Sequence, residues 1–179
     1  MAFIEIGFNT KRPLILGRGG FGTQLNDWLM DEGWGSADFL DDNAPDAVGG
    51  LRDYVDPAIL KRGRPAFVAL GENKLRVELL QKLAAAGYST PVFISDAASV
   101  SPSAVLEPGC IILPQAYVGA DAHLGVGCIV NAGAIVDHNA HLGRGVHVAP
   151  GGIVKASAEV ADFGKVDSGE IVRSPWENQ

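Results

Sequence analysis

A six-residue period governs the second half of the chain, from residue 98 to residue 175. An aliphatic side chain holds the third position of thirteen consecutive six-residue units: Val100, Leu106, Ile112, Val118, Leu124, Val130, Val136, Leu142, Val148, Val154, Val160, Val166 and Val172. The first position is alanine, glycine or cysteine in eleven of these units. Because the period is neither the 3.6 residues of a helix nor the two residues of a strand, it excludes an amphipathic helix and an ordinary strand meander.

Hexapeptide repeats are typical of parallel β-helices, in which each unit is a short strand followed by a turn. One side chain per unit points to the axis, so that stacked coils bury an aliphatic column. The pattern resembles the left-handed parallel β-helix, in which three units complete one triangular coil. Residues 95–179 are therefore expected to form an all-β left-handed parallel β-helix with four coils and one further side. Cys110 and Cys128, 18 residues apart, would be small core residues of neighbouring coils.

The first 94 residues lack the six-residue period and alternate between strand and helix patterns. Short apolar runs predict strands at 13–17, 37–42, 65–71 and 90–95. Helices are expected at 23–33 and 73–87, the second with Asn73 as its N-cap. This alternation indicates a small, Rossmann-like parallel sheet with helices on its faces. The chain is thus predicted to have an α/β domain over residues 1–94, followed by the β-helix domain.

A glycine motif, G-x-G-x-x-G, stands between the first predicted strand and the first predicted helix, at Gly17, Gly19 and Gly22. Free backbone N–H groups at such a turn, together with the helix dipole, favour a phosphate. Asp41 and Asp42 end the next strand, where a carboxylate would bind a ribose or a base. These features predict a nucleotide site. The alternative is a tight turn, with a second, solvated turn at the aspartates.

Charge and composition exclude several classes of partner. The net charge of −7 argues against nucleic acid, since neutralising phosphates requires a basic surface. No apolar run reaches the roughly 20 residues that cross a bilayer, so no membrane insertion is expected. The opening MAFIEIGFNTKRP does not have the pattern of a secretion signal, and two cysteines are too few for a disulfide scaffold. A cytoplasmic protein is expected.

Both halves together resemble the bacterial sugar acetyltransferases that join a small Rossmann-like domain to a left-handed β-helix. These are the sialic-acid O-acetyltransferases and the UDP-4-amino-sugar N-acetyltransferases. Five motifs carry the resemblance in the same order and spacing: ILGRGGFG, FLDD, ALGENK, NAGAIVDH and GRGVHVAPG. The resemblance implies an acetyltransferase that uses acetyl-CoA and acts on a nucleotide-linked amino sugar in bacterial surface glycan biosynthesis. It also implies a homotrimer with active sites between subunits.

The resemblance further implies roles for individual residues. The nucleotide-linked sugar would lie against Gly19, Gly20, Phe21, Asp41, Asp42 and Gly71. His138 would be the general base, since the pKa of a free histidine lies near working pH, and Asn139 would complete the catalytic site. His147 and Ser168 would contact acetyl-CoA, and no metal is implied.

The sequence departs from the family at three points. Phe21 stands where the family often has histidine, and Asn139 stands where it usually has Glu or Asp. Only RSPWENQ follows Val172, where the family continues with a further coil. The short end leaves open a non-catalytic scaffold that binds a nucleotide-linked sugar. A γ-carbonic-anhydrase-like metal enzyme is a third interpretation, because His123 and His141 stack 18 residues apart.

Overall fold

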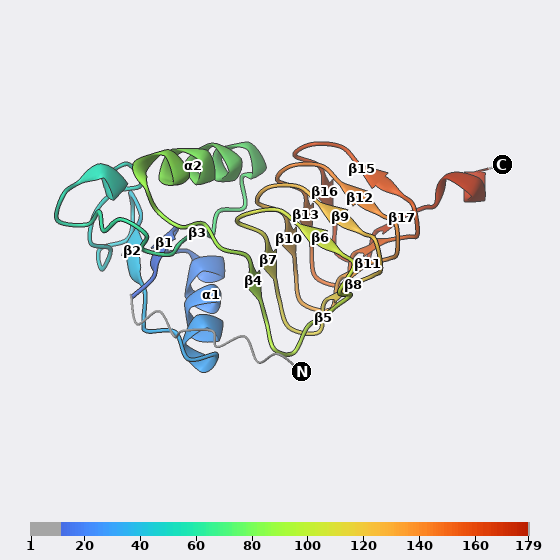
Figure 1. Ribbon diagram of the computed structural model, residues 1–179, viewed down its shortest axis with the longest axis horizontal. Coiled ribbons are helices and arrows are strands. Elements are labelled where there is room, and N and C mark those ends of the chain that lie inside the picture. Colours follow the sequence, from blue (N-terminus) through green and yellow to red (C-terminus); the bar gives the residue numbers. More distant parts are fainter. Residues whose placement is uncertain (1–11, 179) are drawn as a thin grey trace.

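The computed structural model describes residues 12–178, so most of the segment from which the absence of a secretion signal is inferred lies outside the described residues. Two parts follow one another along the chain: an α/β domain built on a small sheet, then a triangular β-helix of about four stacked coils (Figure 1). This architecture confirms the fold class predicted from the sequence. None of the helices within residues 12–178 is long and apolar enough to cross a bilayer.

The α/β domain is a three-stranded parallel sheet with one helix against each face. Its strands, in the order β2-β1-β3, are β1 (Leu14–Leu16), β2 (Asp38–Leu40) and β3 (Ala66–Val68), and its helices are α1 (Gly20–Asp31) and α2 (Asn73–Ala86). Side chains alternate along β1, so Ile15 packs on the α1 side whereas Leu14 and Leu16 pack on the α2 side. A short helix, η1 (Asp53–Val55), lies between β2 and β3. Because both faces are covered, the carboxyl edge of the sheet is the part left for a ligand.

The start of α1 and the N-cap of α2 differ from the sequence prediction, whereas α2 begins at Asn73 as expected. The helix expected from residue 23 begins at Gly20, so the glycine motif forms its first turn. Glu72, not Asn73, caps α2, because its carboxylate accepts hydrogen bonds from the backbone of the first turn. The N-cap prediction for Asn73 was wrong. The Asn73 amide instead donates to the carbonyl oxygens of Phe163 and Gly164 in the β-helix, at 2.9 and 3.0 Å.

Three parallel sheets form the sides of the β-helix, and each strand pairs with strands one coil away. The domain-contact face consists of β4 (Phe93–Ile94), β7 (Ile111–Ile112), β10 (Ile129–Val130), β13 (His147–Val148) and β16 (Lys165–Val166). The apolar face consists of β5 (Ser99–Val100), β8 (Tyr117–Val118), β11 (Ile135–Val136), β14 (Ile153–Val154) and β17 (Ile171–Val172). The histidine face consists of β6 (Val105–Leu106), β9 (His123–Leu124), β12 (His141–Leu142) and β15 (Glu159–Val160).

The aliphatic column predicted for the third position of the repeat lies inside the β-helix. Its central members are fully buried in one cluster: Ile112, Val118, Leu124, Val130, Val136, Leu142, Val148 and Val154. Cys110 and Cys128 are free, buried thiols of the same cluster, which confirms their interpretation as core residues. The first residue of each strand points outward, because side chains alternate along a strand. Each face therefore carries a ladder of outward side chains.

The α/β domain packs against the domain-contact face of the β-helix. Ile111 and Ile129 on this face share a buried cluster with Phe67 of β3. The strand predicted at 90–95 shortens to β4 and pairs with β7, so it starts the β-helix and does not widen the three-stranded sheet. The two domains thus share an apolar core where they meet.

Arg76 of α2 adds polar contacts to this junction. Its side chain is fully buried and donates hydrogen bonds to the carbonyl oxygens of Gly127 and Gly145 in the β-helix, at 2.8 and 2.6 Å. Burial lowers the pKa of Arg76 to about 10, which still leaves the guanidinium charged at neutral pH. The hydrogen bonds and the apolar contact together fix one domain on the other.

Candidate active site

Two glycines of the motif are required by the fold itself. Gly17 has a φ of 102°, and a Cβ at Gly22 would lie 2.0 Å from the Gly17 carbonyl oxygen. A Cβ at Gly19 or Gly20, by contrast, would meet no atom within 4 Å. The backbone therefore presents an open surface at the start of α1, where first-turn N–H groups favour an anion.

Phe21 and Gly71 complete this surface in different ways. The Phe21 side chain packs, partly buried, against the apolar cluster beneath α1, so its backbone and not its ring faces the open side. Gly71 follows β3 in the chain, and a Cβ there would also meet nothing within 4 Å. The loops after two neighbouring strands, β1 and β3, are thus both open at the carboxyl edge.

Asp41 and Asp42 hold the loops at this edge. Oδ2 of Asp41 accepts a hydrogen bond from the N–H of Arg18 at 2.7 Å, and Oδ1 accepts from the N–H of Asn43 at 2.8 Å. These two bonds lower the pKa of the Asp41 carboxyl below its ordinary value. Oδ1 of Asp42 accepts from the N–H of Leu51 at 2.8 Å. Each aspartate therefore positions a loop, which agrees with the turn that the sequence offered as the alternative to a nucleotide site.

A cavity of about 410 Å³ lies between α2 and the segment that follows β2. Its lining mixes apolar and charged side chains: Asp42, Leu51, Arg52, Tyr54, Leu75, Glu78, Leu79 and Lys82. The size falls in the range of roughly 300 to 1,000 Å³ that is usual for small-molecule sites. Because Asp42 lines the cavity and also follows β2 at the carboxyl edge of the sheet, the cavity adjoins the edge that carries the glycine loop.

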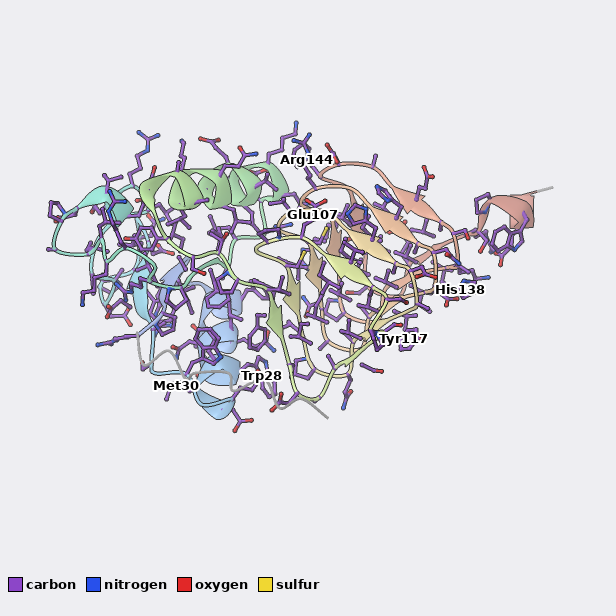
Figure 2. The ribbon with its side chains drawn as sticks, in the orientation of Figure 1. Trp28, Met30, Glu107, Tyr117, His138 and Arg144 are labelled. Atoms are coloured by element: carbon purple, nitrogen blue, oxygen red, sulfur yellow. The ribbon has the colours of Figure 1, made fainter. Side chains whose placement is uncertain are left out.

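His138 lies in the turn between β11 and β12, at the corner where the apolar and histidine faces meet; Figure 2 shows it on the side of the β-helix remote from the α/β domain. Its side chain is exposed, and its Nδ1 is 2.9 Å from Nδ2 of Asn139. Asn139 has a φ of 55°, a left-handed conformation that asparagine adopts more readily than most residues. Oδ1 of Asp137 accepts the backbone N–H of His138 at 2.7 Å. Asn139, rather than Asp137, therefore contacts the imidazole.

His147 and Ser168 lie apart from His138 within one chain. His147 is a half-buried residue of β13 on the domain-contact face, with Nε2 3.3 Å from Nδ2 of Asn131. Ser168 is exposed in the turn after β16. In a triangular coil, the domain-contact face is opposite the corner that carries His138. A single chain therefore does not bring His138 and His147 together.

The pKa of His147 makes a first prediction about pH. Burial, and then the positive charges of Arg76 and Lys165, lower this pKa from 6.5 to about 4. Between these two values the unfolded chain binds a proton that the folded chain does not, so stability falls as the pH falls. We expect His147→Gln to lose less unfolding free energy than the wild type between about pH 7 and about pH 4.5. Urea unfolding at both pH values measures the two free energies. Equal losses in His147→Gln and in the wild type would contradict the lowered pKa of His147.

The outward histidines of the histidine face contact other side chains of the protein. Nε2 of His123 lies 2.9 Å from Oε1 of Glu107, and the rings of His123 and His141 meet edge to face at 4.8 Å. Within residues 12–178, no three His, Cys, Asp or Glu side chains are grouped in a way that could hold a metal ion. The metal-enzyme interpretation thus finds no ligand set in the described part of one chain.

The short tail after β17 is anchored to the β-helix. It forms a short helix, η2 (Pro175–Asn178), and the Ser174 hydroxyl donates to the Ala156 carbonyl oxygen at 2.7 Å. The Lys155 ammonium contacts both carboxylate oxygens of Glu177, at 2.8 and 2.9 Å. Ser174 and Glu177 therefore lie against the same corner of the coils as His138.

The structure also shows a feature that the sequence analysis missed. Four outward apolar side chains stack along the apolar face: Tyr117, Ile135, Ile153 and Ile171. Three of them are more than a third exposed, at 43% for Tyr117, 37% for Ile135 and 46% for Ile171. The sequence pattern that could have predicted this row is an apolar residue at the second position of every third six-residue unit, which recurs every 18 residues. Exposed apolar patches of this kind are typical of interaction surfaces.

Known proteins share both the domain and the fold. Residues 13–83 match the family model described as the PglD N-terminal domain. The acetyltransferase domain of PglB from Neisseria gonorrhoeae FA1090, solved in complex with acetyl coenzyme A, is similar with a TM-score of 0.84 and 29% identity, over 92% of this chain and 83% of that one. A histidine-to-asparagine mutant of perosamine N-acetyltransferase from Caulobacter crescentus was solved in complex with CoA and GDP-perosamine. It has a TM-score of 0.80 and 28% identity, over 86% of this chain and 76% of that one. WeeI from Acinetobacter baumannii AYE shares the fold, with a TM-score of 0.57 and 14% identity over 90% and 93%.

Proposed function

We infer that this protein is a sugar N-acetyltransferase, because it joins a match to the PglD N-terminal domain to a β-helix and is similar to solved acetyltransferases of that build. The proposed reaction transfers the acetyl group of acetyl-CoA to an amino group of a nucleotide-linked sugar. The observation that carries the proposal is an exposed imidazole, His138, on a β-helix that is joined to an open glycine loop. The imidazole on the β-helix offers a proton acceptor, and the glycine loop of the α/β domain offers a site for a nucleotide.

The open carboxyl edge supports a nucleotide as the handle of the substrate. The diphosphate would lie on the backbone of Gly19, Gly20 and Phe21, where the N–H groups of α1 begin. The base would enter the cavity beside Asp42, and the opening at Gly71 would leave room for the sugar. A relative solved with GDP-perosamine supports a nucleoside diphosphate sugar as the substrate class.

His138 is the proposed general base. The sugar nitrogen attacks the thioester carbonyl carbon, the N–C bond forms, the C–S bond breaks, and CoA leaves as a thiolate. Nε2 of His138 takes the proton from the attacking nitrogen and returns it to the thiolate sulfur. Nε2 needs a free lone pair for this, so Nδ1 must carry the ring proton and have an acceptor. A half turn of the Asn139 amide brings its carbonyl oxygen to Nδ1 as that acceptor, since the amide already lies 2.9 Å away.

A homotrimer is the proposed working form. The glycine loop and His138 of one chain are separated by the width of the coil, because the α/β domain covers the face opposite His138. A sugar held by one subunit would therefore meet His138 of a neighbour. The ladder that contains Tyr117 and Ile135 flanks His138 and would be covered by that neighbour. His147, neutral at pH 7, and Ser168 are then proposed to line the acetyl-CoA site between subunits.

The second prediction tests the reaction itself. We expect thiol release when the protein is incubated with acetyl-CoA and a nucleotide-linked amino sugar, with either UDP or GDP as the carrier. Mass spectrometry should locate the acetyl group on nitrogen. The matched controls are the same sugar without its nucleotide and a nucleotide sugar that has only hydroxyl groups, and both should release little thiol. Binding of nucleotide sugars without any thiol release would instead favour the non-catalytic scaffold.

A further inference from the structure

Arg18 is a charged residue inside the glycine motif, between Gly17 and Gly19. Its backbone N–H is fixed by Asp41, and its guanidinium stacks on the Phe39 ring with 4.5 Å between the guanidinium carbon and the ring centroid. Nη1 donates to the Thr23 hydroxyl at 2.5 Å. That hydroxyl in turn donates to the Gly19 carbonyl oxygen at 3.1 Å. The positive charge is thus held within two hydrogen bonds of Gly19, the N-cap of α1.

The carboxylate partner of Arg18 is a surface residue. Nε and Nη2 contact Oδ2 of Asp46 at 3.1 and 3.0 Å, and the Asp46 side chain is 61% exposed, against 27% for Arg18. An ion pair with one side in water contributes little free energy, since the gain is offset by solvation and side-chain entropy. Arg18 is therefore ordered on three sides by Phe39, Thr23 and its own backbone, and on the fourth side it has a partner that a stronger anion can displace.

A nucleoside diphosphate is such an anion. Phosphate oxygens match the planar fork of a guanidinium with two parallel hydrogen bonds, which are stronger than those to a solvated carboxylate. The protein carries a net charge of −7, so binding a ligand with two negative charges requires a local positive charge on the protein surface. The open backbone at Gly19 and Gly20 offers only the partial charges of N–H groups. Arg18 supplies a full charge beside it.

We propose that Arg18 binds the diphosphate of the nucleotide-linked substrate and that Asp46 occupies its guanidinium while the site is empty. The proposal rests on the proposed function, to which it adds a residue that distinguishes a diphosphate from a monophosphate. A monophosphate can be held by the backbone of the glycine loop alone, whereas the second phosphate group is the one that meets Arg18. Asp46 keeps Arg18 in place and must be displaced, so it lowers the affinity for the ligand.

The third prediction is a calorimetric comparison of five proteins with UDP and GDP, and with UMP and GMP. For the diphosphate that the wild type binds, Arg18→Gln should weaken binding about tenfold or more, and for the matching monophosphate by less than about threefold. Asp46→Asn should strengthen diphosphate binding by about threefold, and it should have no such effect in the Arg18→Gln background. Lys61→Gln, an exposed charge loss elsewhere in the domain, is the matched control and should leave both affinities unchanged.

The outcomes separate this proposal from the proposed function. Equal losses for diphosphate and monophosphate in Arg18→Gln, or weaker binding in Asp46→Asn, would overturn the role of Arg18. If the wild type acetylates a nucleotide-linked sugar and Arg18→Gln does so with an unchanged KM, only the role of Arg18 fails. If the wild type binds neither UDP nor GDP, both proposals fail. Arg18→Lys, which keeps the charge but not the fork, should recover part of the diphosphate affinity.

Discussion

Replacing His138 with alanine should lower turnover by about a hundredfold or more, because general-base catalysis typically contributes that much. The affinity for the nucleotide-linked sugar should stay within about twofold, since the glycine loop and the cavity lie in the other domain. Steady-state kinetics with thiol detection, together with calorimetry of the nucleotide sugar, measure the two quantities. A wild type and a His138→Ala variant of equal activity would remove the imidazole from the mechanism.

Two further variants show whether His138 acts as a base. His141→Ala is the matched control, because it removes an outward histidine one strand further along, and it should keep turnover within about threefold. Asn139→Asp places a carboxylate where Nδ1 now meets an amide. A carboxylate favours the protonated ring, so the acidic limb of the rate profile should move to higher pH. A pH profile that is identical in Asn139→Asp and wild type would show that the ring is not titrating in the rate-limiting step.

Charged residues on the apolar face should dissociate the proposed trimer. We expect Ile135→Glu combined with Ile153→Glu to yield monomers, since two carboxylates would have to be buried without partners between subunits. Turnover should fall by more than about a hundredfold, because each proposed site needs residues of two subunits. Nucleotide binding should remain, since the glycine loop is complete within one chain. Sedimentation velocity and the thiol assay together test this prediction.

The control for this pair is Ile135→Val with Ile153→Val, which keeps the face apolar. Its sedimentation and turnover should match those of the wild type. Sedimentation of the wild type as a monomer at micromolar concentration would contradict the trimer directly. A glutamate variant that is monomeric and fully active would leave the subunit interface intact as a structural feature, but it would remove the shared active site from the proposal.

The fold could be predicted from the sequence because its period is so strict. The third position of the repeat places Val136 and Leu142 in the core with no reference to the rest of the chain, and the structure confirms both. The glycine motif likewise predicted the start of a helix at a strand end, although α1 begins earlier than its apolar pattern suggested. The resemblance to the sugar acetyltransferases was also visible in the order of the motifs, and the matches to the PglD N-terminal domain and to the PglB acetyltransferase domain bear it out.

What escaped prediction were contacts between residues far apart in the chain. Asn73 looks like a helix cap in sequence, but the partners of its amide are carbonyls 90 and 91 residues further on. Arg76 looks like a solvated residue of an amphipathic helix, yet two of its three acceptors are 51 and 69 residues away. Arg18 occupies a position of the glycine motif that any residue can fill, and its role depends on the place of Asp46 in the folded chain. Local propensity carries no information on such pairs, because tertiary packing decides them.

The rigid junction at Arg76 has a consequence for substrate choice. Enzymes that close by a hinge adapt to acceptors of different length, whereas here the α/β domain is held on the β-helix by buried hydrogen bonds and a shared core. In the proposed trimer, the distance from the glycine loop of one subunit to His138 of the next would then be fixed. An acceptor amine would therefore have to lie at one fixed distance from the diphosphate, so the rigid junction would select substrates by their length before any contact with the sugar hydroxyls contributes to recognition.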